Sequence, residues 1–311
     1  MNPAARFLPH ELSAGAIKAV ERISLFNSPK FLSIWETLGG KGVYWCNRTN
    51  GGFSSLLAGV EYGSGRLTRF QSMPDGLYTS PFSLHANGWT QPKTQEMTFL
   101  LEAIAKQGYC KIRLYDYMNC LPVLPQFSCR DLFTFVVDIS SPIWEPPDAT
   151  LRSEIRKAER EDIQVELFDE TKHWEPFLSL MEQTERRHGR KPKYPSTFFY
   201  ALAKLAEHDS RVIWKYCAHE GKPAASHIFF VEDMYALHWQ VYFDKEFSWL
   251  KPNQYILFTT IRELQARGIH TISLGASPVD AAGLLSYKEK WGGEIWKYRG
   301  FSRFSWLGRL L

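Results

Sequence analysis

VIWKYCAHEGKPAASHIFFVEDMYALHWQVYF, residues 212–243, is the stretch that decides the fold. It contains three runs rich in β-branched and aromatic residues, at 212–219, 223–231 and 235–243. The runs are separated by short turn signals that contain glycine or acidic residues, at 220–222 and 232–233. Two short turns in succession predict an antiparallel meander of three strands.

The residues after the meander predict a helix and then a strand. Helical spacing of Leu257, Ile261 and Leu264 favours a helix that follows Pro252 and ends at about residue 267, before Gly268. Strands are then expected at 270–277 and 294–301. Because a helix that connects two strands of one sheet is a crossover, the strand after it is expected to lie parallel to its neighbour.

The same order of elements occurs in the first half of the chain. Strands are predicted at 42–47, 53–62 and 66–72, a helix at 93–107, and strands at 110–117 and 132–139. The same short pattern follows both helices: a basic residue, a glycine, an apolar residue and, three positions after the apolar residue, an isoleucine. It reads KQGYCKI at 106–112 and RGIHTI at 267–272. We infer two copies of one unit and an α/β (α+β) fold, in which each lobe has a mainly antiparallel sheet with flanking helices.

The predicted lobes comprise residues 1–148 and 149–301. A helical insert at 149–210 begins the second lobe, because amphipathic stretches interrupt the strand pattern there. Residues 302–311 remain as a tail in which aromatic and aliphatic residues alternate with basic ones. This composition suits either packing onto the body of the protein or contact with a membrane surface.

Composition and charge exclude several classes of protein. The 311 residues are 44% hydrophobic and 23% charged, which describes a globular chain rather than a disordered or fibrous one. The net charge of +4 favours an anionic substrate but lacks the dense basic patch of a dedicated nucleic-acid binder, so no DNA partner is expected. No segment approaches the ~20 apolar residues of a membrane span, and no signal peptide is visible.

Cysteine and histidine spacing predicts neither disulfides nor a metal site. The five cysteines are odd in number and never form C-x-x-C, so we expect reduced thiols in the cytoplasm. The nine histidines are dispersed, and no metal is expected. The sequence also lacks a G-x-S-x-G nucleophile elbow, a P-loop and an H-E-x-x-H motif.

Four motifs, in order along the chain, resemble those of FemAB-like proteins of the GNAT superfamily: LRSEIRKAER (151–160), TERRHG (184–189), KPNQ (251–254) and YKEKWGG (287–293). With the first lobe, the resemblance covers nearly the whole chain. It implies tandem GNAT-like lobes and transfer of an acyl or aminoacyl group to an amine or hydroxyl of a cell-envelope or polysaccharide precursor. The expected protein is an acyltransferase of cell envelope biogenesis, in the cytoplasm or at the inner face of the membrane.

One loop departs from the pattern of GNAT enzymes that use acyl-CoA. Those enzymes usually carry Q/R-x-x-G-x-G/A, whose backbone N–H groups meet the pyrophosphate of CoA. Here the loop DKEFSWLKPN (244–253) contains no glycine, which weakens the case for CoA. We expect aminoacyl-tRNA or acyl-CoA as donor, and no tightly bound cofactor.

Strand 235–243 supplies the candidate catalytic residues. Strict alternation places His238, Gln240 and Tyr242 on one face. Deprotonation of an attacking amine needs a group that titrates near neutrality, and the developing oxyanion needs hydrogen-bond donors. We expect His238 or Tyr242 to relay the proton and Gln240 to orient the acyl group; the alternative is a polar face covered by the helical insert.

Basic residues of the motifs are expected to hold anionic parts of the donor or acceptor. Arg152 and Arg156 stand four residues apart, on one stripe of a helix, and guanidinium groups suit phosphates. A solvated, ion-paired helix face is the alternative. Further substrate contacts that the resemblance implies are Arg187, Lys288, Asp75 and Tyr78. Their structural alternatives are a helix end for Arg187, a surface position for Lys288 and a turn for the other two.

Two classes of function stay open at this point. The first is an enzyme in which the acceptor directly attacks a bound ester or thioester, with an anionic donor, a small-molecule or lipid-linked acceptor, and no covalent enzyme intermediate. The second is a binding or scaffold protein that retains the twin lobes without the chemistry.

Overall fold

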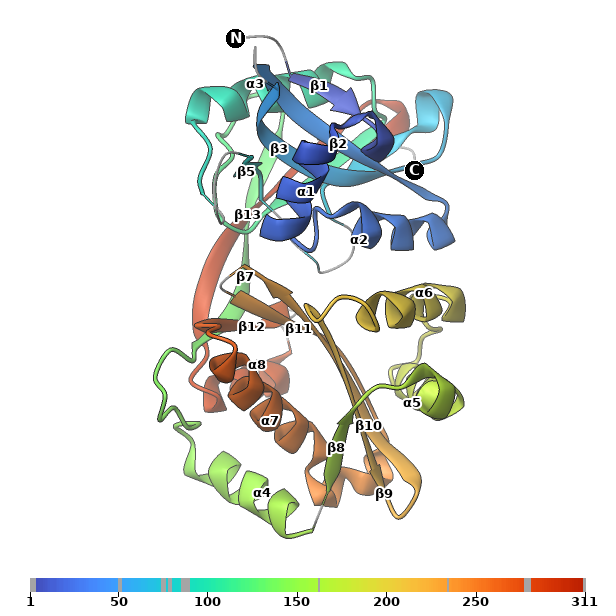
Figure 1. Ribbon diagram of the computed structural model, residues 1–311, viewed down its shortest axis with the longest axis vertical. Coiled ribbons are helices and arrows are strands. Elements are labelled where there is room, and N and C mark those ends of the chain that lie inside the picture. The colour runs from blue at the N-terminus through green and yellow to red at the C-terminus, as the bar shows by residue number, and fades with distance from the viewer. Residues whose placement is uncertain are drawn as a thin grey trace. The chain divides into compact units, whose positions relative to one another are not determined.

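The computed structural model describes residues 4–49, 52–73, 77, 80–84, 90–161, 163–233, 235–276 and 281–309. The chain divides into two compact units (Figure 1): Met1–Phe133 with Lys297–Leu311, and Thr134–Trp296. The division differs from the expected lobes in two respects. The first unit ends at Phe133 rather than at residue 148, and the chain returns to that unit from Lys297 onward.

The first unit is built on a mainly antiparallel sheet. Its strands lie in the order β1 (Ala4–Phe7), β2 (Gly40–Thr49), β3 (Gly52–Tyr62), β4 (Arg69–Gln71), β6 (Lys111–Asp116) and β13 (Glu294–Phe304), and β5 (Phe82–Ser83) pairs with β3. All neighbours are antiparallel except β4 and β6, which the crossover helix α3 (Thr94–Lys106) connects. The predicted meander, helix and parallel strand of the first half are therefore confirmed.

Strand β2 is buried on both faces, which explains its continuous apolar run. Val43 and Trp45 belong to a core that includes Leu100 and Ile104 of α3. On the other face α2 (Pro29–Ile34) approaches so closely that a Cβ at Gly42 would lie 2.9 Å from Leu32. The remaining helical segments of this unit are η1 (Pro9–Glu11), α1 (Ala14–Ile23), η2 (Trp35–Leu38), η3 (Gly65–Leu67) and η5 (Leu307–Arg309).

The second unit repeats this design. Its sheet has the order β7 (Ser128–Asp138, which enters this unit at Thr134), β12 (Thr271–Ala276), β11 (Tyr235–Phe243), β10 (Lys222–Glu232), β9 (Val212–His219) and β8 (Gln164–Leu167). Only β11 and β12 pair in parallel. The meander of residues 212–243 and the crossover are thus confirmed, as is the fold class of two units with mainly antiparallel sheets and flanking helices.

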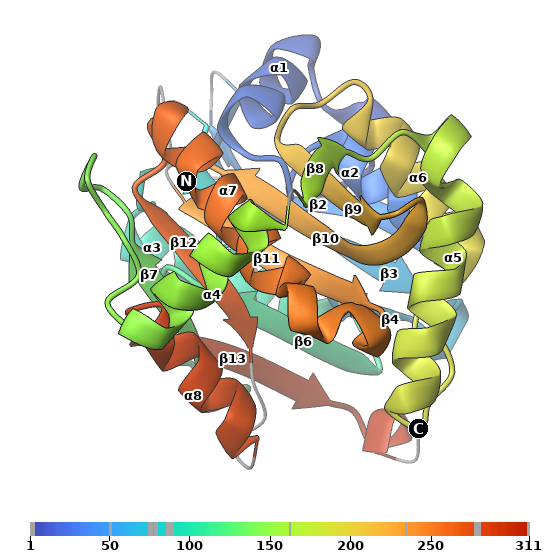
Figure 2. The same ribbon diagram turned by 90° about the horizontal axis from the view of Figure 1, so that it is seen from below.

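Helices cover both faces of the second sheet (Figures 1 and 2). One side carries η4 (Lys245–Leu250), α7 (Pro252–Ala266) and α4 (Ala149–Arg160), and the other carries α5 (Glu170–Arg187) and α6 (Ser196–Ala206); α8 (Ala282–Lys290) precedes β13. The expected helical insert at 149–210 contains α4, α5 and α6, but also strand β8, which extends the sheet.

Three observations bear on the broader expectations. All five cysteines are free thiols, and only Cys129 is more than slightly exposed. Among the described residues no helix is long and apolar enough to cross a membrane. Within the same residues no three His, Cys, Asp or Glu side chains gather as metal ligands.

Candidate functional site

The parallel strands β11 and β12 separate in the middle of the second unit. Their pairing runs from Tyr235↔Thr271 to Leu237↔Ser273 and stops there. Against β7, on its other side, β12 shifts register between Ser273 and Ala276. Gly275 adopts a φ of +77° at this irregularity, and a Cβ there would lie 3.1 Å from the carbonyl oxygen of His238. A glycine is therefore favoured where the strands diverge.

His238, the first residue of β11 beyond this pairing, heads a chain of buried polar side chains. Nε2 of His238 lies 3.1 Å from Nδ1 of His227 on β10, and Nε2 of His227 lies 2.9 Å from Oδ1 of Asn253 in the first turn of α7. The ring of His238 stacks on Phe229 with a centroid distance of 4.5 Å. The three polar residues thus come from two strands and a helix that the fold brings together.

The hydrogen bonds between Asn253, His227 and His238 determine which ring nitrogens carry protons. Because the amide oxygen of Asn253 can only accept, Nε2 of His227 donates to it, and Nδ1 of the neutral His227 is left to accept from Nε2 of His238. Nδ1 of neutral His238 then carries a lone pair, and within the described part of the chain no side chain or backbone group donates a hydrogen bond to it. The arrangement supplies a proton acceptor at a defined atom.

Burial keeps both imidazoles neutral. Loss of hydration lowers the pKa of His227 to about 4, although its bond to Asn253 acts in the opposite direction. Burial, followed by His227 and then Lys288, lowers the pKa of His238 well below its ordinary value. Neither ring is charged at neutral pH.

Lys288 of α8 lies buried beside the same divergence. Its Nζ donates to the carbonyl oxygens of Gly275 and, at 3.4 Å, Ala276. Thr134 also donates to the Gly275 carbonyl, at 2.8 Å, and its Oγ1 lies 2.9 Å from Oγ of Ser273. Burial lowers the pKa of Lys288 to about 8, so the amine is charged at neutral pH but close to losing its proton. The surface alternative for Lys288 is wrong.

The predicted row of His238, Gln240 and Tyr242 is split between the two faces of the sheet. A β-bulge at Trp239 changes the register from Phe229↔His238 to Ile228↔Gln240, so that strict alternation fails. Tyr242 packs on α5 and α6, and the centroid of its ring lies 5.5 Å from that of Phe177 and 5.9 Å from that of Phe199. The register places Gln240 on that same face, whereas His238 faces α7. The prediction that these three side chains share a face is therefore wrong.

Two of the three predicted arginines, Arg152 and Arg156, lie at one cleft, and Arg187 lies elsewhere. Arg152 donates from Nη1 to the carbonyls of Pro146 (2.7 Å) and Pro147 (2.8 Å), whereas Arg156 is exposed. Both line a cleft of about 260 Å³ beside Phe258. Arg187, at the end of α5, stacks 4.2 Å from the centroid of Phe243 and donates to its carbonyl oxygen. Asp75 and Tyr78 lie outside the described residues.

A carboxylate stands beside the first turn of α7. Glu154 of α4 pairs with Nζ of Lys251 at 2.7 Å and accepts a hydrogen bond from Gln254 at 3.2 Å. Lys251, the N-cap of α7, has a φ of 61°. The end of the glycine-free loop is thus tied to α4 by a negative side chain.

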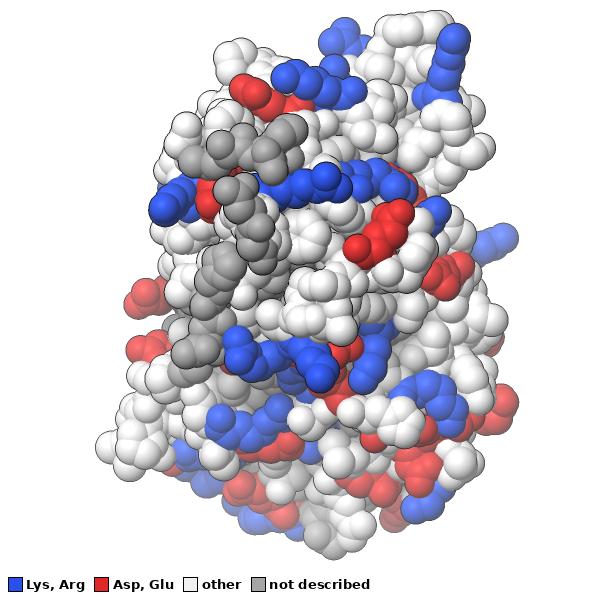
Figure 3. Space-filling model, turned by 45° about the horizontal axis from the view of Figure 1, so that its top comes forward, with Lys and Arg blue, Asp and Glu red and all other residues white. Residues whose placement is uncertain are grey.

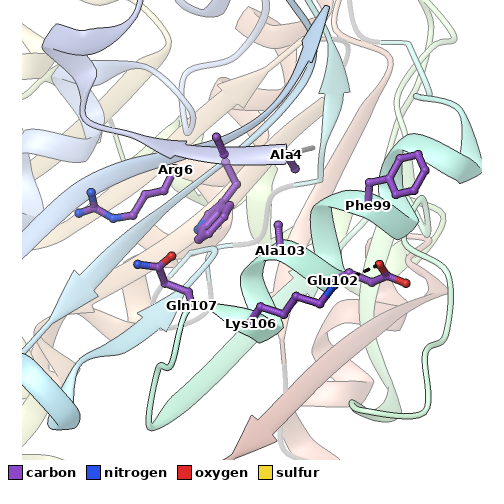
Figure 4. A pocket seen from close by; sticks show the side chains of 9 residues that line it. Ala4, Arg6, Phe99, Glu102, Ala103, Lys106 and Gln107 are labelled. Atoms are coloured by element: carbon purple, nitrogen blue, oxygen red, sulfur yellow. Dashed lines mark ion pairs between the residues drawn. The ribbon is translucent and has the colours of Figure 1, made fainter. Parts of the chain in front are cut away.

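The first unit has an open pocket of about 620 Å³ between β1 and α3 (Figure 4). Its charged groups are engaged within the protein: Arg6 binds Glu61 through two hydrogen bonds, and Lys106 lies 3.9 Å from Glu102 along α3. On the face of the molecule in Figure 3, basic side chains form short rows interrupted by acidic ones. Neither feature gathers polar groups as the separation of β11 and β12 does.

The sequence predicted only part of the site. His238 and Lys288 were expected, but His227, Asn253, Thr134 and Ser273 were not. The turn at 232–233 could have revealed His227. If the strands on either side of this turn are paired residue by residue, residue 229 lies opposite His238. His227, two residues before 229, then lies on the same face of the sheet as His238.

Comparison with known proteins agrees with this architecture. The acetyltransferase (GNAT) domain family matches residues 148–289. The crystal structure of FemX is similar over 100% of both chains, with 11% identity and a TM-score of 0.73. The C-terminal domain of a protein described as a lysylphosphatidylglycerol synthetase from Agrobacterium fabrum has 11% identity and a TM-score of 0.60, over 95% of this chain and 93% of that domain.

A tandem GNAT protein from the clavulanic acid biosynthesis pathway is also similar, with 10% identity and a TM-score of 0.51 over 96% of this chain and 97% of that one. No curated protein is significantly similar in sequence. The chain has the tandem GNAT fold over its full length, and residues 148–289 match the acetyltransferase (GNAT) domain family.

Proposed function

We propose that the protein transfers an acyl or aminoacyl group to an amine, or to a hydroxyl, of a cell-envelope or polysaccharide precursor. The observation that carries the proposal is the chain His238–His227–Asn253, which leaves a proton acceptor where β11 and β12 separate, inside the GNAT domain. The acceptor group attacks the carbonyl of a bound ester or thioester directly, without a covalent enzyme intermediate.

In this reaction Nδ1 of His238 takes the proton that the attacking amine loses. The bond between the attacked carbonyl carbon and the donor oxygen or sulfur then breaks, and this oxygen or sulfur receives the proton from His238 and leaves as the alcohol or thiol. The chain to Asn253 holds the required tautomer, because rotation or tautomerisation of His238 would break its bond to His227. The positive charge of Lys288 stabilises the oxyanion that develops on the attacked carbonyl. Tyr242 has no part in this step, since its ring packs among Phe177 and Phe199 on the opposite face.

The donor that fits best is an aminoacyl ester such as aminoacyl-tRNA. A pyrophosphate beside the first turn of α7 would meet the carboxylate of Glu154, and the loop before the helix has no glycine to let a phosphate approach the backbone. The similar A. fabrum domain belongs to a protein named for a product in which lysine is joined to phosphatidylglycerol, which supports aminoacyl transfer. Arg156, exposed at the cleft beside Phe258, is the first candidate for an anionic part of the donor, although Glu145 and Glu159 line the same cleft.

Native mass spectrometry tests the donor. The purified protein is offered mixed aminoacyl-tRNAs, mixed acyl-CoAs and nucleotide-sugar precursors in separate samples, and we expect retention of aminoacyl-tRNA. Retention of acyl-CoA alone would contradict the argument from Glu154 and the loop. Retention of a donor that is never consumed with any acceptor would favour a binding protein.

A further inference from the structure

Three segments of the first unit meet at one end of its sheet. The N–H of Cys110 donates to the carbonyl of Thr68, and the N–H of Ser305 donates to the carbonyl of Cys110, both at 2.9 Å. A Cβ at Gly308 would collide with the Cys110 carbonyl, so the glycine lets η5 pack against this point. The backbone of residues 304–309 is therefore held in place.

Large apolar side chains at this end remain in solvent although the backbone is packed. Trp306 is 73% exposed, Leu67 49% and Phe304 36%. They belong to segments that the hydrogen bonds of Cys110 join, and Phe304 pairs in register with Lys111. A fixed backbone that presents an indole, a phenyl ring and a leucine to water is an exposed apolar site rather than a frayed end.

Basic residues surround these side chains. Arg66 is next to Leu67, Arg69 and Lys111 are register partners on neighbouring strands, and Arg309 ends η5. The segments 63–69, 110–113 and 302–309 contain no acidic residue. Among the described residues these four cations take part in no ion pair with a carboxylate. Burial, Arg113 and Arg69 together lower the pKa of Lys111, as expected where cations crowd.

We propose that Leu67, Phe304 and Trp306 with Arg66, Arg69, Lys111 and Arg309, here called the strand-end patch, dock the protein on an anionic membrane surface. Indole and phenyl rings favour the boundary between headgroups and acyl chains, and the cations contact anionic headgroups. Single-stranded RNA would stack its bases on the rings of Phe304 and Trp306 and leave Leu67 without a role, whereas a membrane surface takes up all three apolar side chains. The proposal does not depend on acyl transfer.

Vesicle flotation tests the patch. The full chain is mixed with vesicles of phosphatidylcholine alone, or of phosphatidylcholine with phosphatidylglycerol, and we expect flotation only with the anionic vesicles. Trp306→Ala should weaken the partition coefficient about tenfold, because it removes the largest exposed apolar side chain. The double variant Arg66→Glu with Arg309→Glu should weaken it at least twentyfold, since each lost basic contact near an anionic surface is worth about fivefold.

The matched control is Trp249→Ala, which removes a 48% exposed tryptophan from the second unit and should leave flotation unchanged. Far-ultraviolet circular dichroism checks that every variant is folded. Failure of the wild type to float, or equal flotation of Trp306→Ala and wild type, would overturn the proposal. So would binding of a single-stranded RNA probe that Arg66→Glu with Arg309→Glu abolishes while no vesicle is bound, because the patch would then serve nucleic acid.

Discussion

Nε2 of His238 lies 3.1 Å from Nδ1 of His227, its neighbour across the hairpin of β10 and β11. A second contact, from His227 to Asn253, determines the direction of this hydrogen bond. The relationship makes His227 and Asn253 positioning residues: neither needs to touch substrate, yet together they leave Nδ1 of His238 without a proton.

Asn253→Asp should move the acid limb of the pH–rate profile toward neutrality. A carboxylate at this position favours protonated His227 and raises its pKa from about 4. Protonated His227 can no longer accept from His238, so activity would be lost as pH falls through the raised pKa. The pH dependence of kcat/KM checks this, with Asn253→Gln as the neutral control; an unshifted limb would show that His227 does not position His238.

Lys288 should impose an alkaline limb near pH 8. Its pKa is lowered to about 8 by burial, so the charge that stabilises the oxyanion disappears as pH rises through that value. Lys288→Arg keeps a charge that does not titrate in this range and should abolish the limb, whereas Lys288→Met should lower kcat about 100-fold below pH 8, with the difference from wild type shrinking above it. Persistence of the limb in Lys288→Arg would assign it to another group.

Folding stability should decrease on mild acidification because of His227. Its pKa is about 4 in the folded protein against 6.5 when solvated, so the unfolded state binds more protons between these values. The loss begins below pH 6.5 and amounts to about 3 kcal/mol near pH 4. Urea unfolding of wild type and His227→Gln at a series of pH values measures it; parallel curves for the two proteins would contradict the prediction.

Tyr242→Phe should retain turnover within about twofold, because the hydroxyl lies on the face of α5 and α6. Steady-state kinetics with the donor identified by native mass spectrometry makes the measurement. A loss of 100-fold or more, in a variant with unchanged melting temperature, would return Tyr242 to the mechanism.

The fold was predictable because its information is local. The turns at 220–222 and 232–233 define the meander, and the glycines at 108 and 268 end the two crossover helices, so the repeated order could be read without tertiary knowledge. Strand β8 was not predicted, because a strand of four residues between two helices is too short to show a clear alternation of apolar and polar residues.

The site was less predictable because it depends on irregularities that no period reveals. One extra residue at Trp239 moves Tyr242 and Gln240 to the far face, and the sequence has no glycine or proline there to mark a bulge. Asn253 reaches His227 only after α7 has packed on the sheet. Similarly, the segment that carries the exposed Trp306 is held by the fit of Gly308 against Cys110, a contact between distant segments.

The measurement that tests the central claim most directly is single-turnover consumption of the retained donor by wild type and by His238→Gln, with a nucleophilic amine as acceptor. His208→Gln, at an exposed histidine beyond α6, is the matched control. We predict that all three proteins retain the donor and that His238→Gln consumes it about 10² to 10⁴ times more slowly, while His208→Gln matches wild type. Equal rates for His238→Gln and wild type would contradict the assignment of His238 as the proton acceptor.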